Sequence, residues 1–196
     1  MRLAGVNAIS PIIATDQECL EAWRRRASAE GLRPLVERYV AFVYSSAYRR
    51  TGSADHAGEV TRAVFVVLAR RARRLRQKTV LAGWLFHVTA VACRKLVGRP
   101  KRRGWWRWLG RRSSSGEPPF VALWPRVRRE LEAAIERLSS AQRDAVLLRV
   151  LLNQDSASVA RTLRTSERRA TNYVERGLKK ITRWLRRRSV VTDAET

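Results

Sequence analysis

The chain has 196 residues, of which 45% are hydrophobic, so it can form one domain or two small domains with apolar cores. It has 41 lysines and arginines against 17 acidic residues, a formal net charge of +24. An excess this large predicts a polyanionic partner, with nucleic acid the first candidate and an anionic membrane surface the second.

Several other classes of protein do not fit the sequence. Cys19 and Cys93 are far apart and no CxxC or Cys/His spacing is present, so no zinc site is recognisable. The acidic residues are scattered, and His56 and His87 are isolated. We therefore expect no catalytic residues, metal, cofactor or small-molecule substrate. The uncharged stretch over residues 80–93 is too short to span a bilayer. Reduced thiols fit a cytoplasmic protein, and we expect no membrane partner.

Helical periodicity predicts a first module over residues 15–98, after an unpatterned tail at residues 1–14. Thr15 and Glu18 form a capping box that begins a short helix. We expect Gly31 to separate this helix from the next one, which begins at Pro34. The expected helices span residues 15–29, 34–50, 55–75 and 81–97, with a loop around residues 76–79.

The composition then changes. Residues 99–125 are rich in Gly, Pro, Ser, Arg and Trp, which predicts a basic and partly disordered linker. A second module is expected over residues 126–188, followed by a polar tail at residues 189–196. Its expected helices span residues 126–138, 139–152, 155–163 and 166–188, and the second of them has Ala145, Val146, Leu148 and Val150 available for burial. Because no segment has a strand pattern, the predicted fold class is all-α, two small helical domains on a basic linker.

A short helix, a tight turn and a long helix between Asp155 and Arg188 predict a helix-turn-helix. The inward residues of the long helix are expected to be Ala170, Val174, Leu178, Ile181 and Leu185. Arg169, Asn172, Arg176 and Lys179 follow each other at helical spacing on the opposite face. In a major groove, Arg can bond guanine and Asn can bond adenine with two hydrogen bonds each. Thr165, Ser166 and Arg168 are placed for phosphate contacts at the start of the helix.

The alternative for this charged face is a solvated helix surface that only keeps the protein soluble. The turn before the helix and the charge of +24 favour DNA binding over that alternative.

Two stretches resemble extracytoplasmic-function (ECF) bacterial sigma factors. Residues 56–99, with Ala57-Gly58-Glu59-Val60-Thr61-Arg62-Ala63-Val64-Phe65 and then Leu81-Ala82-Gly83-Trp84-Leu85, resemble region 2 of that family. Residues 138–149, Leu-Ser-Ser-Ala-Gln-Arg-Asp-Ala-Val-Leu-Leu-Arg, are similar to the opening of region 4. The resemblance covers residues 15–188 in the family's order and spacing.

The resemblance implies a transcription initiation protein that is not an enzyme. Region 2 would bind core RNA polymerase and the opened −10 strand, and region 4 would bind the −35 duplex. Promoter DNA and core polymerase are the implied partners, and an anti-sigma factor is a further candidate. The polymerase-binding positions are Glu59, Thr61 and Arg62. The −10 positions are Arg74, Arg76, Gln77, Lys78, Thr79, Arg94 and Lys95.

A second hypothesis is a diverged DNA-binding regulator that no longer binds core polymerase. It is favoured by Gly58, Arg62 and Ala63, which stand where the family usually has Glu, Gln and Glu or Ala.

Overall fold

The computed structural model describes residues 15–26, 29–97 and 119–188. The predicted tails and most of the predicted linker, with its tryptophans Trp105, Trp106 and Trp108, lie outside these ranges. All regular structure within the described residues is helical. The predicted all-α class is confirmed.

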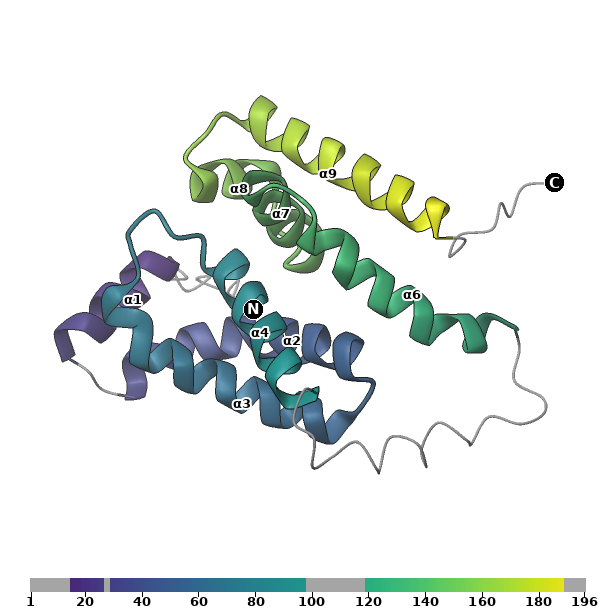
Figure 1. The fold of residues 1–196 in the computed structure, drawn as a ribbon. Coiled ribbons are helices and arrows are strands. Elements are labelled where there is room, and N and C mark those ends of the chain that lie inside the picture. The colour runs from purple at the N-terminus through teal and green to yellow at the C-terminus, as the bar shows by residue number, and fades with distance from the viewer. Residues whose placement is uncertain (1–14, 27–28, 98–118, 189–196) are drawn as a thin grey trace, which may run out of the picture.

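The first module is a helical bundle (Figure 1). Its elements are α1 (Asp16–Arg26), α2 (Ala29–Thr51), α3 (Ala54–Arg71), the 3-10 turn η1 (Ala72–Arg74) and α4 (Leu81–Val97). The predicted capping box is formed, since the backbone N–H of Thr15 donates to Glu18 Oε2 at 2.6 Å and that of Glu18 donates to Thr15 Oγ1 at 3.3 Å. Burial of its apolar stripes stabilises the bundle. The core includes Leu20, Leu35, Tyr39, Val43, Val64, Leu68 and Leu85.

The predicted break at Gly31 is wrong. Helix α2 begins at Ala29 and contains both Gly31 and Pro34. A Cβ atom on Gly31 would lie 3.2 Å from the Cα of Trp23 in α1, so the glycine permits a close approach of the two helices. Pro34 lacks a backbone N–H, but tertiary packing of the following turns outweighs that local loss.

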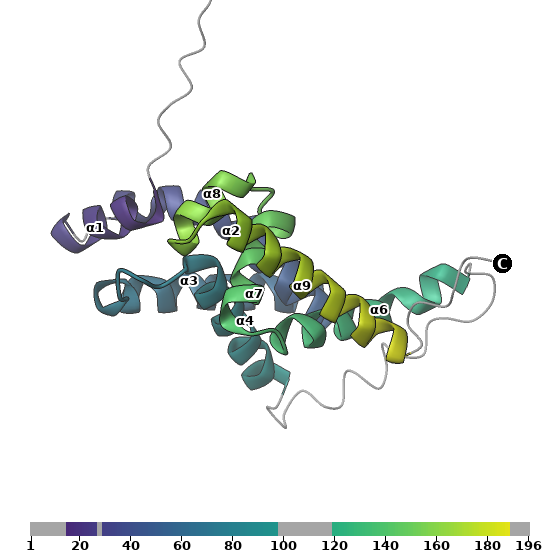
Figure 2. The same ribbon diagram turned by 90° about the horizontal axis from the view of Figure 1, so that it is seen from above.

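The second module consists of α6 (Pro119–Glu136), α7 (Ser140–Val146), the π-helical turn η3 (Leu147–Leu151), α8 (Ser156–Leu163) and α9 (Glu167–Arg187). Helix α9 packs against α6, α7 and α8, as the two perpendicular views show (Figures 1 and 2). Helix α6 begins at Pro119, earlier than the predicted start at residue 126. Proline is favoured at a first helical position because no helical partner is lost there.

The helix predicted over residues 139–152 changes its winding. Ser139-Ser140-Ala141-Gln142 has the sequence pattern of a second capping box, but Ser139 precedes α7 without a side-chain capping hydrogen bond, so this second box is not formed. After Val146 the chain widens into η3, which places Leu147 in the core at 0% exposure and leaves Val150 50% exposed. The expected burial of Val150 is therefore wrong, because a π turn rotates the following residues relative to an α-helical register.

Candidate nucleic-acid interface

The turn between α8 and α9 has defined caps at both ends. Asp155 Oδ1 accepts a 2.6 Å hydrogen bond from the N–H of Ser158 at the start of α8, and this bond lowers the pKa of Asp155. Arg164 ends α8 in the left-handed conformation, at φ 52° and ψ 49°. The next N–H, of Thr165, donates to the carbonyl of Ala160 at 3.0 Å, as in glycine-terminated helices. The turn therefore has the tight helix-turn-helix geometry even though Arg164 occupies the usual glycine position.

Ser166 caps α9, since its Oγ accepts from the N–H of Arg169 at 3.4 Å. The inner face of α9 buries Ala170, Gly177 and Ile181. A Cβ atom on Gly177 would lie only 2.6 Å from Val146 Cγ2. Leu178, expected inside, is 40% exposed, because the close contact with α7 falls on Gly177 instead.

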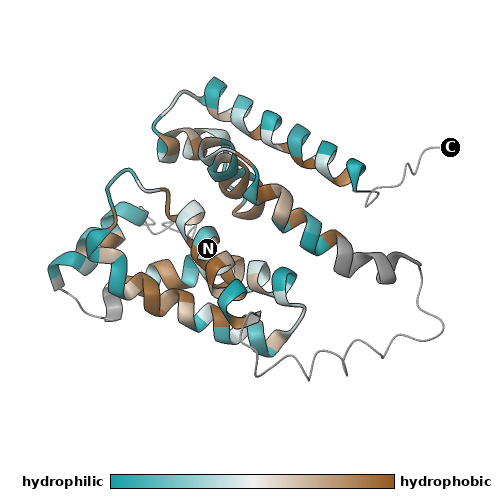
Figure 3. Cartoon of the chain, in the orientation of Figure 1, coloured by the Kyte–Doolittle hydropathy of each residue, from teal (hydrophilic) through white to brown (hydrophobic). Residues whose placement is uncertain are grey.

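The outer face of α9 is polar along its whole length (Figure 3). Five side chains of the predicted DNA-binding set are exposed there: Arg168, Arg169, Asn172, Arg176 and Lys179. Ser166 is also exposed, and Thr165 is half-buried beside it. No hydrogen bond or ion pair to another described residue engages the side chains of those five, so they can contact an external partner.

The loop between η1 and α4 has a fixed backbone and outward side chains. Its backbone is held by Arg24 Nη2, which donates to the carbonyl of Leu75 at 2.5 Å, and by Gln17 Nε2, which donates to that of Thr79 at 3.5 Å. Arg74, Arg76, Gln77 and Lys78 are exposed, and Thr79 is half-buried. The predicted −10 side chains of this loop are thus gathered on one anchored segment.

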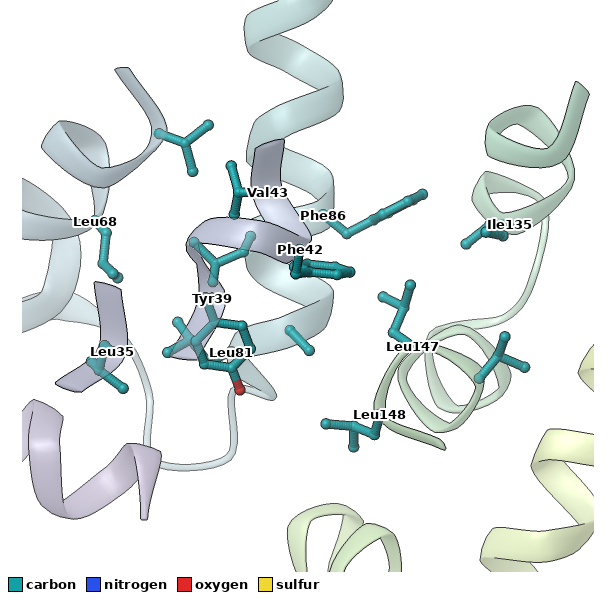
Figure 4. Close-up of a cluster of buried hydrophobic side chains, with 14 of the residues drawn as sticks. Leu35, Tyr39, Phe42, Val43, Leu68, Leu81, Phe86, Ile135, Leu147 and Leu148 are labelled. Atoms are coloured by element: carbon teal, nitrogen blue, oxygen red, sulfur yellow. The ribbon is translucent and has the colours of Figure 1, made fainter. Parts of the chain in front are cut away.

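The two modules pack directly on each other. Helix α6 contacts α2, and α7 and η3 contact α4; we call this packing the closed arrangement. On the apolar side of the contact, Phe86 points toward Ile135 and Leu147 across the boundary (Figure 4). All three side chains are buried. The hydrophobic core is therefore shared between the modules.

Charged residues reinforce the closed arrangement. Glu132 of α6 is 2% exposed and lies 2.5 Å from Arg49 Nε and 2.8 Å from Arg50 Nη2, both in α2. Arg50 Nη1 also lies 2.5 Å from Glu136 Oε1, and we call Arg49, Arg50, Glu132 and Glu136 the interdomain ion cluster. A buried carboxylate needs such partners, because its desolvation is otherwise too costly.

Two residues of the predicted −10 set take part in contacts between the modules. Arg94 Nη1 lies 3.5 Å from Glu136 Oε1. The guanidinium of Arg164, at the helix-turn-helix turn, donates to the carbonyl of Gln77 at 3.2 Å.

Asp144 forms a third contact between the modules, with no charged partner in α4. A Cβ atom on Gly83 would lie 1.9 Å from Asp144 Oδ1, so the carboxyl group packs on the bare backbone of α4. Burial raises the pKa of Asp144 to about 6, although Arg143 opposes the shift.

Comparison with known proteins identifies both modules. Residues 35–103 match the sigma-70 region 2 family model, and residues 128–181 match the model of sigma-70 region 4. Together they span more than half of the chain. The chain belongs to the sigma-70 family of RNA polymerase sigma factors. It directs RNA polymerase to promoters through region 2 and region 4, and it is not an enzyme.

The further comparisons add little detail. No curated protein matches the sequence. One similar solved structure is the sigma factor RpoE from Bartonella quintana in complex with the anti-sigma factor NepR, at 14% identity and a TM-score of 0.37. That match covers 81% of this chain and 98% of the RpoE chain.

The three positions predicted to bind polymerase are not equally accessible. Arg62 is exposed and Glu59 is half-buried. Thr61 is buried at 8% exposure and its hydroxyl donates to the carbonyl of Ala57 at 2.7 Å, so it has little surface for a partner. Glu59 also lines a groove of about 640 Å³ between α3 and α4, beside Trp84 and Lys95.

The remaining region 2 positions lie on α3 and α4. Arg94, Lys95 and His87 of α4 are exposed, so His87 is not a core residue. Phe65 is half-buried and packs against the core. Among the described residues no helix is long and apolar enough to cross a membrane, and no three metal-binding side chains gather in that part of the chain.

The sequence reasoning missed the interdomain ion cluster. Glu132 was detectable as a carboxylate beside the inward stripe of α6, one turn before Ile135 and Glu136. Its partners Arg49 and Arg50 lie in the other module, and nothing in the sequence pairs them with it.

Proposed function

We propose that region 4 of this sigma factor recognises the −35 duplex through the outer face of α9. The observation that carries the proposal is the alignment of Arg169, Asn172 and Arg176 on an exposed helix face that follows a tight turn. Arg and Asn side chains in a major groove distinguish guanine and adenine by paired hydrogen bonds. Thr165, Ser166, Arg168 and Lys179 flank that face, where contacts to phosphates would fix the position of the helix on the duplex.

Alanine substitutions test this assignment. Arg169→Ala, Asn172→Ala and Arg176→Ala should each weaken binding to the preferred duplex by about 1–3 kcal/mol and relax the choice of base at one position. Arg187→Ala, at the far end of α9, is the matched control and should weaken all duplexes alike. Binding is measured by fluorescence anisotropy against a randomised duplex library. Unchanged sequence preference in the three variants would show that another face contacts the bases.

The −10 strand is assigned to region 2 in the same proposal. Arg74, Arg76, Gln77, Lys78 and Thr79 provide cationic and amide groups on a loop with an anchored backbone, which suits an unstacked single strand. Arg94 and Lys95 extend the positive surface along α4. Binding energy for an unpaired base would favour strand opening without any bond chemistry.

Use of both elements requires the closed arrangement to open. Elements centred at −10 and −35 are roughly 25 base pairs apart, about 85 Å at ~3.4 Å per base pair. A compact chain of this length has a radius of gyration of about 16 Å. One closed molecule therefore cannot reach both elements, and region 4 would separate from region 2 on a promoter.

Polymerase binding is assigned to the surface that Glu59 and Arg62 share on α3. Charge reversal tests it: Glu59→Arg should reduce the core polymerase that co-purifies with the tagged sigma factor, with duplex binding intact. Asp55→Arg, an exposed substitution in the first turn of the same helix, is the control for altered charge. Wild-type protein that binds duplex DNA but retains no polymerase would instead support the diverged regulator, which the unusual Gly58, Arg62 and Ala63 favour.

An anti-sigma factor is a further proposed partner, and the cytoplasm, where polymerase acts, is the proposed compartment. Both rest on family membership. Affinity purification of the tagged chain from its own cells tests the anti-sigma partner: besides the fraction that contains core polymerase, we expect a second fraction in which a stoichiometric partner replaces the polymerase. Fractionation of the same cells tests the compartment.

A further inference from the structure

A cavity of about 650 Å³ with both polar and apolar walls lies between the −10 loop and the helix-turn-helix. Region 2 contributes the start of α1 and residues 77–81, and region 4 contributes residues of α8 and the turns on both sides of it. Cavities of this size hold nucleotide-sized ligands. Because both modules form the walls, the cavity exists only in the closed arrangement.

Positive charge predominates in its walls. Lys78, Arg161 and Arg164 line the cavity and form no ion pair within 4 Å with a described residue, although Arg161 interacts electrostatically with the nearby carboxylate of Asp155. The fourth cation, Arg38, pairs with Asp16, which also accepts from Tyr39. The positive charges of Lys78, Arg161 and Arg164 are therefore not neutralised by ion pairs, and an anionic ligand would neutralise them.

Two buried hydrogen-bond acceptors in the cavity favour a ligand that has donor groups over inorganic phosphate. Gln17 Oε1 and Gln154 Oε1 are buried without a hydrogen-bond partner among the residues that the structure describes, and both residues line the cavity. A buried acceptor that lacks a donor costs free energy, so a ligand that donates to it is favoured. Inorganic phosphate at neutral pH offers few donors, whereas ribose hydroxyls and base amino groups offer several.

The wall also has an apolar part. Val80, Leu81 and Leu152 line the cavity beside the polar groups. The planar base of a nucleotide can pack on such a surface, while the phosphates of the same nucleotide contact Lys78, Arg161 and Arg164. Cations, acceptors and an apolar wall together match the three parts of a nucleotide.

We infer that the closed sigma factor binds a free nucleoside polyphosphate in the cavity between Lys78 and Arg161. The ligand contacts both modules, so it binds the closed arrangement and not the open one. By linkage it stabilises the closed arrangement and opposes occupancy of the −10 and −35 elements. It is bound and not converted. The inference uses the closed arrangement but not the assignment of bases to α9.

The test measures binding of GTP and of ATP to the full-length free protein by equilibrium dialysis at a salt concentration that suppresses weak charge binding. Arg161→Gln and Lys78→Gln remove one cavity cation each. Arg25→Gln, on the exposed part of α1 and outside the cavity, removes the same charge elsewhere. Arg161→Lys is the conservative variant. A third ligand arm uses single-stranded oligothymidine without a 5′ phosphate, which offers bases and backbone phosphodiesters but neither a polyphosphate nor a ribose 2′-hydroxyl.

The expected result is saturable binding of one nucleotide per chain, weakened at least tenfold by Arg161→Gln and by Lys78→Gln. Arg25→Gln should leave the affinity unchanged, Arg161→Lys should retain most of it, and the bound protein should have a smaller radius of gyration on average. Three outcomes overturn the inference: no saturable nucleotide binding, equal loss in Arg25→Gln and Arg161→Gln, or cavity-dependent binding of oligothymidine alone. None of these outcomes bears on duplex recognition by α9, which the alanine substitutions test separately.

Discussion

The carboxylate of Glu132 in region 4 lies 2.5 Å from the guanidinium of Arg49 in region 2, and Glu132 is 2% exposed. This contact joins the two modules through a charge that only the closed arrangement satisfies. When the modules separate, water must replace Arg49 and Arg50 around Glu132. The same contact therefore stabilises the closed arrangement and opposes the open form that we propose for promoter binding.

Glu132→Gln should open the protein. Removal of one partner from a buried ion pair costs about 3–5 kcal/mol, and here that cost falls on the closed arrangement. Small-angle X-ray scattering should show a larger radius of gyration. Glu37→Gln removes the exposed ion pair with Arg33, worth at most about 1 kcal/mol, and should leave the radius unchanged. Equal radii for wild type and Glu132→Gln would mean that the ion cluster does not hold the modules together.

Gly83→Ala should also favour the open form. The added Cβ would lie 1.9 Å from Asp144 Oδ1 and 2.8 Å from its Cγ, so the buried carboxyl group would have to leave its place against α4, which removes one contact between α7 and α4. Gly58→Ala is the matched control in the same bundle, because nothing lies within 4 Å of its added Cβ. That control should raise the stability of region 2 by about 0.5–1 kcal/mol, as expected for glycine to alanine within a helix. Fluorescence energy transfer between dyes on the two modules should fall in the first variant and stay constant in the second.

The closed arrangement should weaken as pH rises through about 6. The pKa of Asp144 is raised from 3.8 to about 6 in the closed arrangement, where its carboxyl group packs on α4, and should return toward 3.8 on opening. A raised pKa means that the closed form binds the proton more tightly, so protonation favours closure and ionisation opposes it.

Energy transfer between the modules, measured from pH 5 to 7.5, should therefore decrease with pH. Asp144→Asn keeps the shape without the charge and should give a flat, high signal. A pH dependence that persists in Asp144→Asn would assign it to another group.

Gly177→Ala should destabilise region 4. Alanine normally strengthens a helix interior by about 1 kcal/mol relative to glycine. Here the added Cβ would meet Val146 Cγ2 at 2.6 Å, and overpacking of this kind costs about 1–3 kcal/mol. Denaturant unfolding should show a lower midpoint with an unchanged slope. A further Val146→Ala substitution should restore part of the loss by making room for the methyl group.

Much of the fold could be predicted because its local signals agree. The Thr15–Glu18 capping box, the cap at Ser166 and the charged face of α9 depend on residues within a few turns of each other. The sequence also places Arg169, Asn172 and Arg176 on one face, since helical spacing alone decides that.

The predictions that are wrong concern residues whose conformation or burial depends on contacts with residues far away in the sequence. The sequence predicts a helix break at Gly31, but this glycine packs beside Trp23 within a helix. It also predicts a buried Leu178, but Gly177 makes the close contact with Val146. The π turn at Leu147–Leu151 has no signal in the residue pattern. The partners of Glu132 and the cavity around Arg161 depend on how two modules pack, which hydrophobic periodicity does not encode.

Reconstituted transcription tests the central claim most directly. Purified core polymerase is incubated with a library of genomic fragments, with and without the protein, and transcript starts are mapped. We expect discrete starts that need the protein, share upstream elements near −10 and −35, and disappear with the combined Arg169→Ala, Asn172→Ala and Arg176→Ala variant. A protein that binds duplex DNA with sequence preference, yet yields no additional starts with core polymerase, would contradict promoter-directing activity.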